Sequence, residues 1–307
     1  MSNCHESSHA LAASITRAAS QQTYYTIRLL ADRQHIFDAY RAYAYFRWMD
    51  DHLDLGTLAK PKRTEFLDRQ RSLMEDCFQG KWPRRLTAEE RMLADLIRGD
   101  REKNSGLQSY IRNMMDVMVF DAERRYQLIS QEELARYTRS LSTAVTEAMH
   151  HFIGNGSSSP KNESRYIAVT AAHIIHMLRD TLEDASAGYF NIPREFLETH
   201  AITPHDVSSE PYRMWVRSRI QLARDYFEAG KDNIAQVENT RCRIAGWAYI
   251  ARFEIVSNAI EKDGYRLRSE YSECKNLRAK IKMLWRVFSM ALARNQRLAN
   301  LNTKQSA

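Results

Sequence analysis

Two acidic groups in the sequence each combine carboxylates at a spacing of four with a run of helix-forming residues. They are residues 50–54 (DDHLD) and residues 180–184 (DTLED). Residues four apart share one face of an α-helix, so each group presents a pair of carboxylates. Mg²⁺ prefers oxygen ligands and is usually shared between one or two carboxylates and a substrate phosphate. The two pairs therefore predict a site that binds Mg²⁺ together with a diphosphate.

The sequence context of both groups argues against two solvated helix faces. Apolar segments precede them, at residues 43–49 (YAYFRWM) and 174–179 (IIHMLR). Charged side chains are rarely buried unless they are paired or bind a metal. Arg47 lies three residues before the first group and Arg179 lies directly before the second. Because a guanidinium can hold phosphate oxygens bidentately, acid and arginine together favour a binding site.

Two motifs in a fixed order make the chain resemble the squalene and phytoene synthases. Residues 23–54, with 39–54 (AYRAYAYFRWMDDHLD) as their core, are similar to that family's first signature, in which aromatic residues, an arginine and DDxxD follow in order. Residues 176–184 (HMLRDTLED), followed by residues 188–193 (GYFNIP), are similar to the second signature. Weaker similarity extends the resemblance to about residues 20–285, through residues 120–126, 133–137 and 259–265.

The resemblance implies an all-α fold, a single-domain helical bundle of the isoprenoid-synthase type with a central cavity. It also implies a reaction, the head-to-head condensation of two allylic prenyl diphosphates, farnesyl or geranylgeranyl diphosphate, with release of diphosphate. The product would be of the phytoene, dehydrosqualene or presqualene type. Mg²⁺, with Mn²⁺ as the alternative, would be the cofactor. The missing C-terminal membrane anchor and the absence of GxGxxG favour a non-reducing, phytoene-synthase-like member.

Carried over to this chain, the resemblance assigns roles to individual side chains. The metal ligands are expected to be the four aspartates of the two acidic groups, Asp50, Asp54, Asp180 and Asp184. The contacts to diphosphate are expected from Tyr43, Arg47 and Arg179. Tyr137 falls where the family has a pocket tyrosine, and it joins the aspartates in the expected catalytic set.

The chain departs from the family at two histidines. His173 and His176 stand where glutamine and asparagine are usual, and with Asp180 they share one helix face. They could donate hydrogen bonds to diphosphate, accept a proton from a late carbocation, or bind a softer metal. The alternative is that they only hydrogen-bond the carboxylates. Phe253 in place of a tyrosine, and residues 142–146 (STAVT) in place of AGxVG, leave the product open.

Helices must position all of these residues. Only 10 glycines and 6 prolines occur among the 307 residues, which leaves few turn signals. Long apolar periodicities predict roughly ten helices in one domain over residues 20–298. The clearest of them span residues 107–128, 134–153, 212–234, 245–260 and 277–298. Residues 154–162 (GNGSSSPKN) are either a mobile rim of the site or a linker. Residues 1–19 are predicted to form a flexible tail, and residues 299–307 a polar one.

Composition argues against several other classes. The four cysteines, at positions 4, 77, 242 and 274, show no metal-binding spacing and are too few to staple the chain, which predicts a reducing cytoplasm. The net charge is +7, but the basic residues are scattered apart from a modest cluster at residues 275–286, so nucleic-acid binding is not expected. A peripheral contact with an anionic membrane stays open. No segment approaches the roughly 20 apolar residues that span a bilayer, and no signal-peptide core is present.

Two other functions stay open. A class I terpene synthase or a chain-elongating prenyltransferase would use the same acidic groups on a single diphosphate substrate. A non-catalytic relative would act as an assembly factor, although such relatives have lost the aspartates that this chain keeps. Residues 121–125 (DAERR) are interpreted as a charge network at a helix end rather than as a third metal site.

Overall fold

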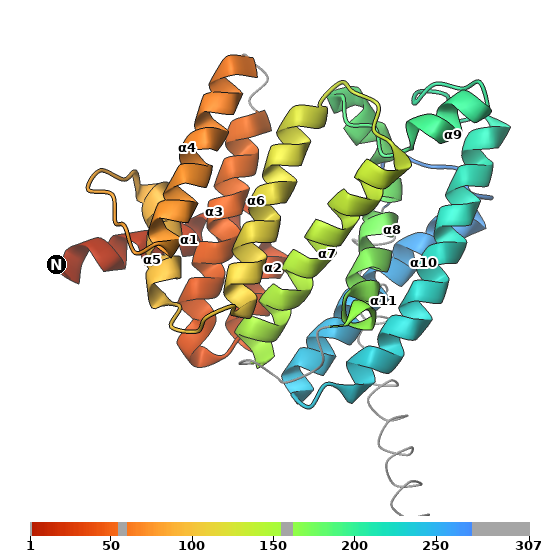
Figure 1. The fold of residues 1–307 in the computed structure, drawn as a ribbon. Coiled ribbons are helices and arrows are strands. Elements are labelled where there is room, and N and C mark those ends of the chain that lie inside the picture. The colour runs from red at the N-terminus through yellow and green to blue at the C-terminus, as the bar shows by residue number, and fades with distance from the viewer. Residues whose placement is uncertain (1, 55–59, 155–161, 272–307) are drawn as a thin grey trace, which may run out of the picture. The chain divides into compact units, whose positions relative to one another are not determined.

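The protein is all-α, as the sequence predicts. A computed structural model describes residues 2–54, 60–154 and 162–271, and no strand occurs within these ranges (Figure 1). None of the helices in the described part of the chain is both long enough and apolar enough to cross a membrane.

The chain divides into two compact units. Unit 1 comprises Met1–Glu123 and Thr143–Ser157, and unit 2 comprises Arg124–Ser142 and Ser158–Ala307. The first acidic group therefore belongs to unit 1 and the second to unit 2. The single domain predicted over residues 20–298 reaches beyond the described residues and stays a prediction.

Unit 1 is built around α3, whose alanine and aromatic side chains are buried together. Tyr45 and Met49, one turn apart, have no exposed surface, and α3 packs against α1 and α5. This packing fixes the end of α3 that carries the first acidic group. The helices of the unit are α1 (Ser2–Ala19), α2 (Gln21–Leu30), the short 3₁₀ helix η1 (Arg33–His35), α3 (Ile36–Asp54), α4 (Lys60–Phe78), α5 (Ala88–Gly99), α6 (Gly106–Arg124) and α7 (Gln131–Gly154). The boundary with unit 2 falls within α6 and α7.

Helix α1 corrects one prediction, because the structure places a packed helix where the sequence predicts a flexible tail over residues 1–19. Ala12 and Thr16, one turn apart, are fully buried where α1 lies against α3 and α5. Ser8 Oγ donates a hydrogen bond to Asp95 Oδ2 at 3.0 Å. Small side chains let helix backbones approach closely, so α1 packs without the large apolar residues that a periodicity search requires.

Unit 2 is built around α8, which carries the second acidic group. Its buried core includes Ile175 of α8, Ile220 and Phe227 of α10, and Ile250 and Ile260 of α11. The helices that begin in this unit are α8 (Glu163–Ala187), α9 (Arg194–Thr199), α10 (Glu210–Gln236) and α11 (Thr240–Lys262). The first half of α7 belongs to it as well.

The predicted helical segments agree with the structure wherever it describes them. Four of them coincide with α6, α7, α10 and α11 and differ only at their ends. The break predicted at residues 154–162 separates α7 from α8, although residues 155–161 lie outside the described part. The segment at 277–298, the basic cluster at 275–286 and the tail at 299–307 also lie outside it.

A glycine sets the distance between α8 and α10. A Cβ added at Gly230 would lie 2.7 Å from Ala168 Cβ and 2.9 Å from Ala168 Cα, closer than atoms pack in proteins. Because the backbone of α8 cannot yield as a flexible side chain would, only glycine allows this approach.

We predict that Gly230→Ala lowers the free energy of unfolding by about 1–3 kcal/mol, even though alanine has the better helix propensity. Urea unfolding measures the change. Gly99→Ala is the control, because a Cβ there would meet Asp38 Oδ2 only at 3.7 Å. Equal stability of the two variants would contradict the close approach.

Candidate active site

The first acidic group forms a cluster of like charges at the C-terminal end of α3. Burial, together with repulsion from Asp54 and Asp121, raises the pKa of Asp50 to about 6. Arg47 opposes this rise without reversing it. Asp121 lies in α6, so two helices of unit 1 contribute carboxylates. The Asp50 side chain still exposes 44% of its surface, so this crowded carboxylate stays open to solvent.

The predicted diphosphate contacts of unit 1 lie on the same face of α3 as these carboxylates. Arg47 Nη1 lies 3.4 Å from Asp50 Oδ2, and Arg47 Nη2 donates to Asp51. Tyr43 is half-buried one turn before Arg47. The structure therefore brings Tyr43, Arg47, Asp50 and Asp54 together on one helix face.

The negative charge of Asp180, in the second acidic group, is compensated by hydrogen-bond donors beside it. Arg179 donates two hydrogen bonds to its carboxylate, from Nε and Nη2, each at 2.6 Å. His176 Nε2 lies 2.8 Å from Asp180 Oδ2. Burial would raise the pKa of Asp180, but the hydrogen bonds from Arg179 and His176 outweigh it and hold the pKa well below its usual range. Asp180 is therefore ionised at any physiological pH.

Asp184 is held by two residues that the sequence did not single out. Asn191 Nδ2 donates to Asp184 Oδ2 at 2.7 Å, and Arg124 Nη1 donates to Asn191 Oδ1 at 2.9 Å. Both residues lie in segments that the resemblance covers, at 120–126 and 188–193, but no spacing rule connects them to Asp184. The network interpretation of residues 121–125 fits Arg124, whereas Asp121 belongs to the acidic cluster of unit 1.

The two histidines differ in their surroundings. His176 is half exposed and contacts Asp180, as the purely structural alternative requires. His173 is 5% exposed, and neither of its ring nitrogens has a hydrogen-bond partner among the described residues. Burial, together with repulsion from the neighbouring His176 and Arg124, lowers the pKa of His173 to about 3. His173 is therefore a neutral imidazole whose donor and acceptor nitrogens are both unpaired among the described residues.

A series of aromatic rings lies beside Asp180 in unit 2. The ring of Tyr137 is 5.3 Å from that of His173, and His176 is 6.2 Å from Phe253. Tyr249 follows at 5.1 Å from Phe253, and burial raises its pKa to about 12. Such a surface suits an apolar chain, and ring faces stabilise cations.

The carboxylates fit a divalent cation that is bound partly by other ligands. Within the described residues, no group of three or more His, Cys, Asp or Glu side chains could hold a metal ion by itself. Mg²⁺ normally keeps several waters and shares a substrate phosphate, so paired carboxylates are a sufficient protein contribution. The mutual repulsion of Asp50, Asp54 and Asp121 is the observation that favours a cation here.

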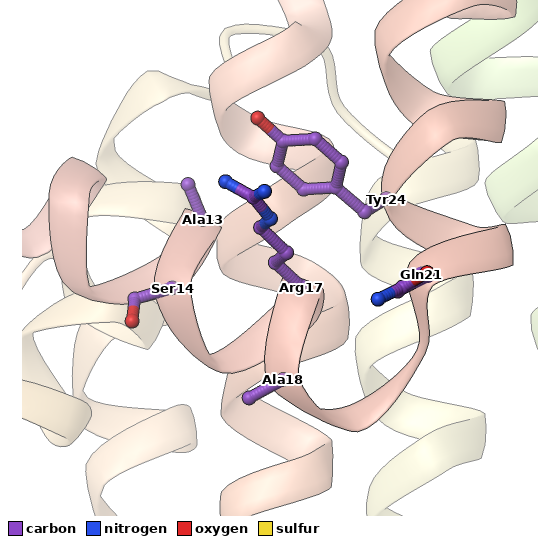
Figure 2. Close-up of a pocket in the computed structure, with 6 residues that line it drawn as sticks. All are labelled: Ala13, Ser14, Arg17, Ala18, Gln21 and Tyr24. Atoms are coloured by element: carbon purple, nitrogen blue, oxygen red, sulfur yellow. The ribbon is translucent and has the colours of Figure 1, made fainter.

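A pocket of about 540 Å³ lies elsewhere in unit 1, between α1 and α2. Figure 2 shows the Arg17 guanidinium beside the ring of Tyr24, with Cζ 5.8 Å from the ring centroid, and Gln21 at the start of α2. Ala13, Ser14 and Ala18 complete the lining. Tyr24 belongs to the first signature segment, but none of the predicted site residues lines this pocket.

Sequence comparisons relate the chain to known enzymes. Residues 16–285 match the squalene/phytoene synthase family. The chain is 26% identical to the chloroplastic phytoene synthase of Daucus carota over 254 residues, which are 80% of this chain and 61% of the carrot protein. It is 27% identical to the 15-cis-phytoene synthase of Synechococcus elongatus over 110 residues, 34% of this chain and 35% of that protein. The aligned part thus spans less than two thirds of either relative.

Solved structures of low sequence identity share the fold. Squalene synthase HpnC from Alicyclobacillus acidocaldarius superimposes with a TM-score of 0.67 at 19% identity, over 85% of this chain and 95% of that one. A dehydrosqualene synthase in complex with a ligand gives a TM-score of 0.71 at 16% identity, over 95% and 99%. The helical isoprenoid-synthase fold predicted from the sequence is confirmed.

We predict that Asp50 makes stability fall as pH rises from about 4 to about 6 in the absence of divalent cations. The folded protein keeps the Asp50 proton up to a pKa of about 6, whereas the ordinary value is 3.8, so the folded state binds more protons in this window. Asp50→Asn should therefore melt at a higher temperature than wild type at neutral pH, and the difference should shrink on acidification.

Thermal denaturation across this pH range tests the prediction, with Asp232→Asn as the control. Asp232 is exposed on α10, far along the chain from the acidic groups. A difference between Asp50→Asn and wild type that does not change with pH would show that the charge of Asp50 is not its cause.

Proposed function

Because the chain belongs to the squalene/phytoene synthase family, we propose that it is a prenyltransferase that condenses two allylic prenyl diphosphates head to head. One observation carries the proposal. Each of the two acidic groups keeps an arginine against a carboxylate, with Arg47 3.4 Å from Asp50 and Arg179 2.6 Å from Asp180. The pairing supplies ligands for a metal and for a diphosphate at both places.

The four aspartates would hold Mg²⁺, or Mn²⁺ as the alternative. When bound, the metal would neutralise the charge that develops on a leaving diphosphate. The chain's own residues prepare this site. Asp180 stays ionised because Arg179 and His176 donate to it, and the forked guanidinium groups of Arg47 and Arg179 can bind diphosphate oxygens as they now bind carboxylates.

The aromatic residues of unit 2 would receive the prenyl chain. Tyr137, His176 and Phe253 offer ring faces that exclude water from a carbocation and stabilise its charge. His173 is neutral and its ring nitrogens have no partner within the described part of the chain, so we assign it a contact with the substrate. His176 already contacts Asp180, so we assign it to orienting that carboxylate.

The phytoene synthases among the relatives favour a non-reducing reaction on farnesyl or geranylgeranyl diphosphate, with a product of the phytoene or dehydrosqualene type. The central cavity, the cytoplasmic location and a peripheral membrane contact stay predictions. The test that follows distinguishes this function from the two alternatives, a single-substrate terpene synthase and a non-catalytic assembly factor.

We predict that incubation with farnesyl or geranylgeranyl diphosphate and Mg²⁺ yields a hydrocarbon-soluble product that contains two prenyl units. Asp50→Asn and Asp180→Asn should each lower turnover at least about a hundredfold, because each removes a metal ligand from the leaving-group site. Asp232→Asn is the control and should keep wild-type turnover. A product with one prenyl unit would identify a terpene synthase instead, and an inert wild type would support the assembly factor.

We predict opposite effects of His173→Leu on stability and on activity. Removing a buried imidazole whose nitrogens have no partner among the residues that the structure describes should raise the free energy of unfolding by about 1 kcal/mol or leave it unchanged. Turnover should fall or the product should change, because the contact with substrate is lost. His176→Asn should keep substantial activity, since an amide can donate the same hydrogen bond to Asp180. A His173→Leu variant that is destabilised but fully active would leave His173 a purely structural role.

A further inference from the structure

We propose that Asn191 and Arg124 are positioning residues, which together hold the Asp184 carboxylate in the orientation in which it binds the cation that accompanies diphosphate. The proposal rests on the proposed function, in which Asp184 is a metal ligand. Asn191 and Arg124 would act through Asp184 and would not touch the metal or the substrate themselves.

The position of Asp184 in its helix means that its carboxylate requires a hydrogen-bond donor. It lies in the last turn of α8, which ends at Ala187, and a carboxylate is disfavoured at the negative end of a helix dipole. Asn191 meets this need with a hydrogen bond of 2.7 Å. Asp180, one turn earlier, instead takes its hydrogen bonds from Arg179 and His176. The amide of Asn191 orients Asp184 without adding a positive charge of its own that would compete with a cation.

The chemistry of the three groups fixes the direction of the amide. A guanidinium only donates hydrogen bonds and an ionised carboxylate only accepts them. A residue between them must accept at one end and donate at the other, which a carboxamide does. Arg124 donates to Asn191 Oδ1 at 2.9 Å, so Asn191 Nδ2 is directed toward Asp184. Replacing the amide with an apolar side chain of similar size removes both ends of the link at once.

Arg124 is itself held in place. Only 7% of its surface is exposed, and its Cζ lies 4.8 Å from the ring centroid of Tyr137 and 5.3 Å from that of Tyr189. Its Nη1 also lies 3.5 Å from the carbonyl oxygen of Phe190. Rings stacked on a guanidinium restrict it to one plane, so its direction toward Asn191 is set before any ligand binds.

The backbone brings the Asn191 loop back toward the end of α6. Gly188 ends α8 with φ at +88°, and a Cβ there would lie 2.5 Å from ring carbons of Tyr126. The Tyr126 N–H donates to the Gly188 carbonyl at 2.7 Å, and Arg125 Nε donates to the Ala187 carbonyl at 3.2 Å. These bonds fix the start of the loop, so the link from Arg124 to Asp184 is preorganised within unit 2.

Binding of Mg²⁺ in the presence of inorganic pyrophosphate tests the proposal without turnover. The readout is the Mg²⁺ concentration that gives half of the maximal increase in melting temperature. Asn191→Leu should raise this concentration about 10- to 100-fold, the usual effect of removing a partner of a metal ligand. Arg124→Lys leaves the loop sequence intact and keeps the charge but loses the fork, so it should raise the concentration by a smaller factor.

Asn258→Leu is the matched control, because Asn258 Oδ1 also accepts a hydrogen bond from an arginine, Arg224, at 2.9 Å, between α10 and α11. It should leave the Mg²⁺ concentration within about twofold of wild type, well below the shift expected for a partner of a metal ligand. In turnover, the defect of Asn191→Leu should disappear at saturating Mg²⁺, because a positioning role changes affinity for the metal.

Three results would overturn the proposal, and they can be told apart. Unchanged Mg²⁺ dependence in both Asn191→Leu and Arg124→Lys would show that the link does not position Asp184. A loss of turnover that saturating Mg²⁺ does not restore would assign the two residues a structural role. A wild type whose melting temperature does not respond to Mg²⁺ with pyrophosphate would contradict the proposed function, and the positioning role with it. If Asn191→Leu does not fold, Arg124→Lys alone decides between these results.

Discussion

Carboxylates one helical turn apart repel each other, and each unit compensates that repulsion differently. In unit 1 the repulsion among Asp50, Asp54 and Asp121 is not fully compensated, and this contributes to the raised pKa of Asp50. In unit 2 the repulsion is relieved by donors, from Arg179 and His176 at Asp180 and from Asn191 at Asp184. A bound cation would therefore reduce the repulsion most in the first group, whereas hydrogen bonds already orient the carboxylates of the second.

Two buried polar side chains in unit 2 differ in how the protein accommodates them. Arg124 is buried, yet its hydrogen bonds and ring contacts accommodate it fully within the protein. His173 is buried to a similar degree, and the described residues offer no partner to its ring nitrogens. An unsatisfied buried donor costs stability, so a side chain of this kind is usually retained for a ligand or a bound water. Tyr137 contacts both residues.

Sequence reasoning worked best where function or folding depends on neighbours along one helix. The spacing of Asp50 and Asp54, and of Asp180 and Asp184, predicted carboxylate pairs on single faces, and long apolar periodicities located the helices. It failed for α1, because burial there depends on small side chains such as Ala12 that fit against α3. It also missed the link from Arg124 through Asn191 to Asp184, because residues 67 positions apart meet only when the loop after α8 turns back.

By itself the sequence determined the helical fold class, the family and the identity of the chemically capable side chains, since these follow from residue types and from spacing within a helix. Tertiary structure decided what each side chain does. The sequence pattern places both histidines on one helix face. Packing leaves His176 exposed beside Asp180 but buries His173 among aromatic rings, and the pKa of His173 is lowered to about 3. Desolvation and hydrogen-bond geometry depend on every group that surrounds an atom, and residues distant in the chain supply most of these groups.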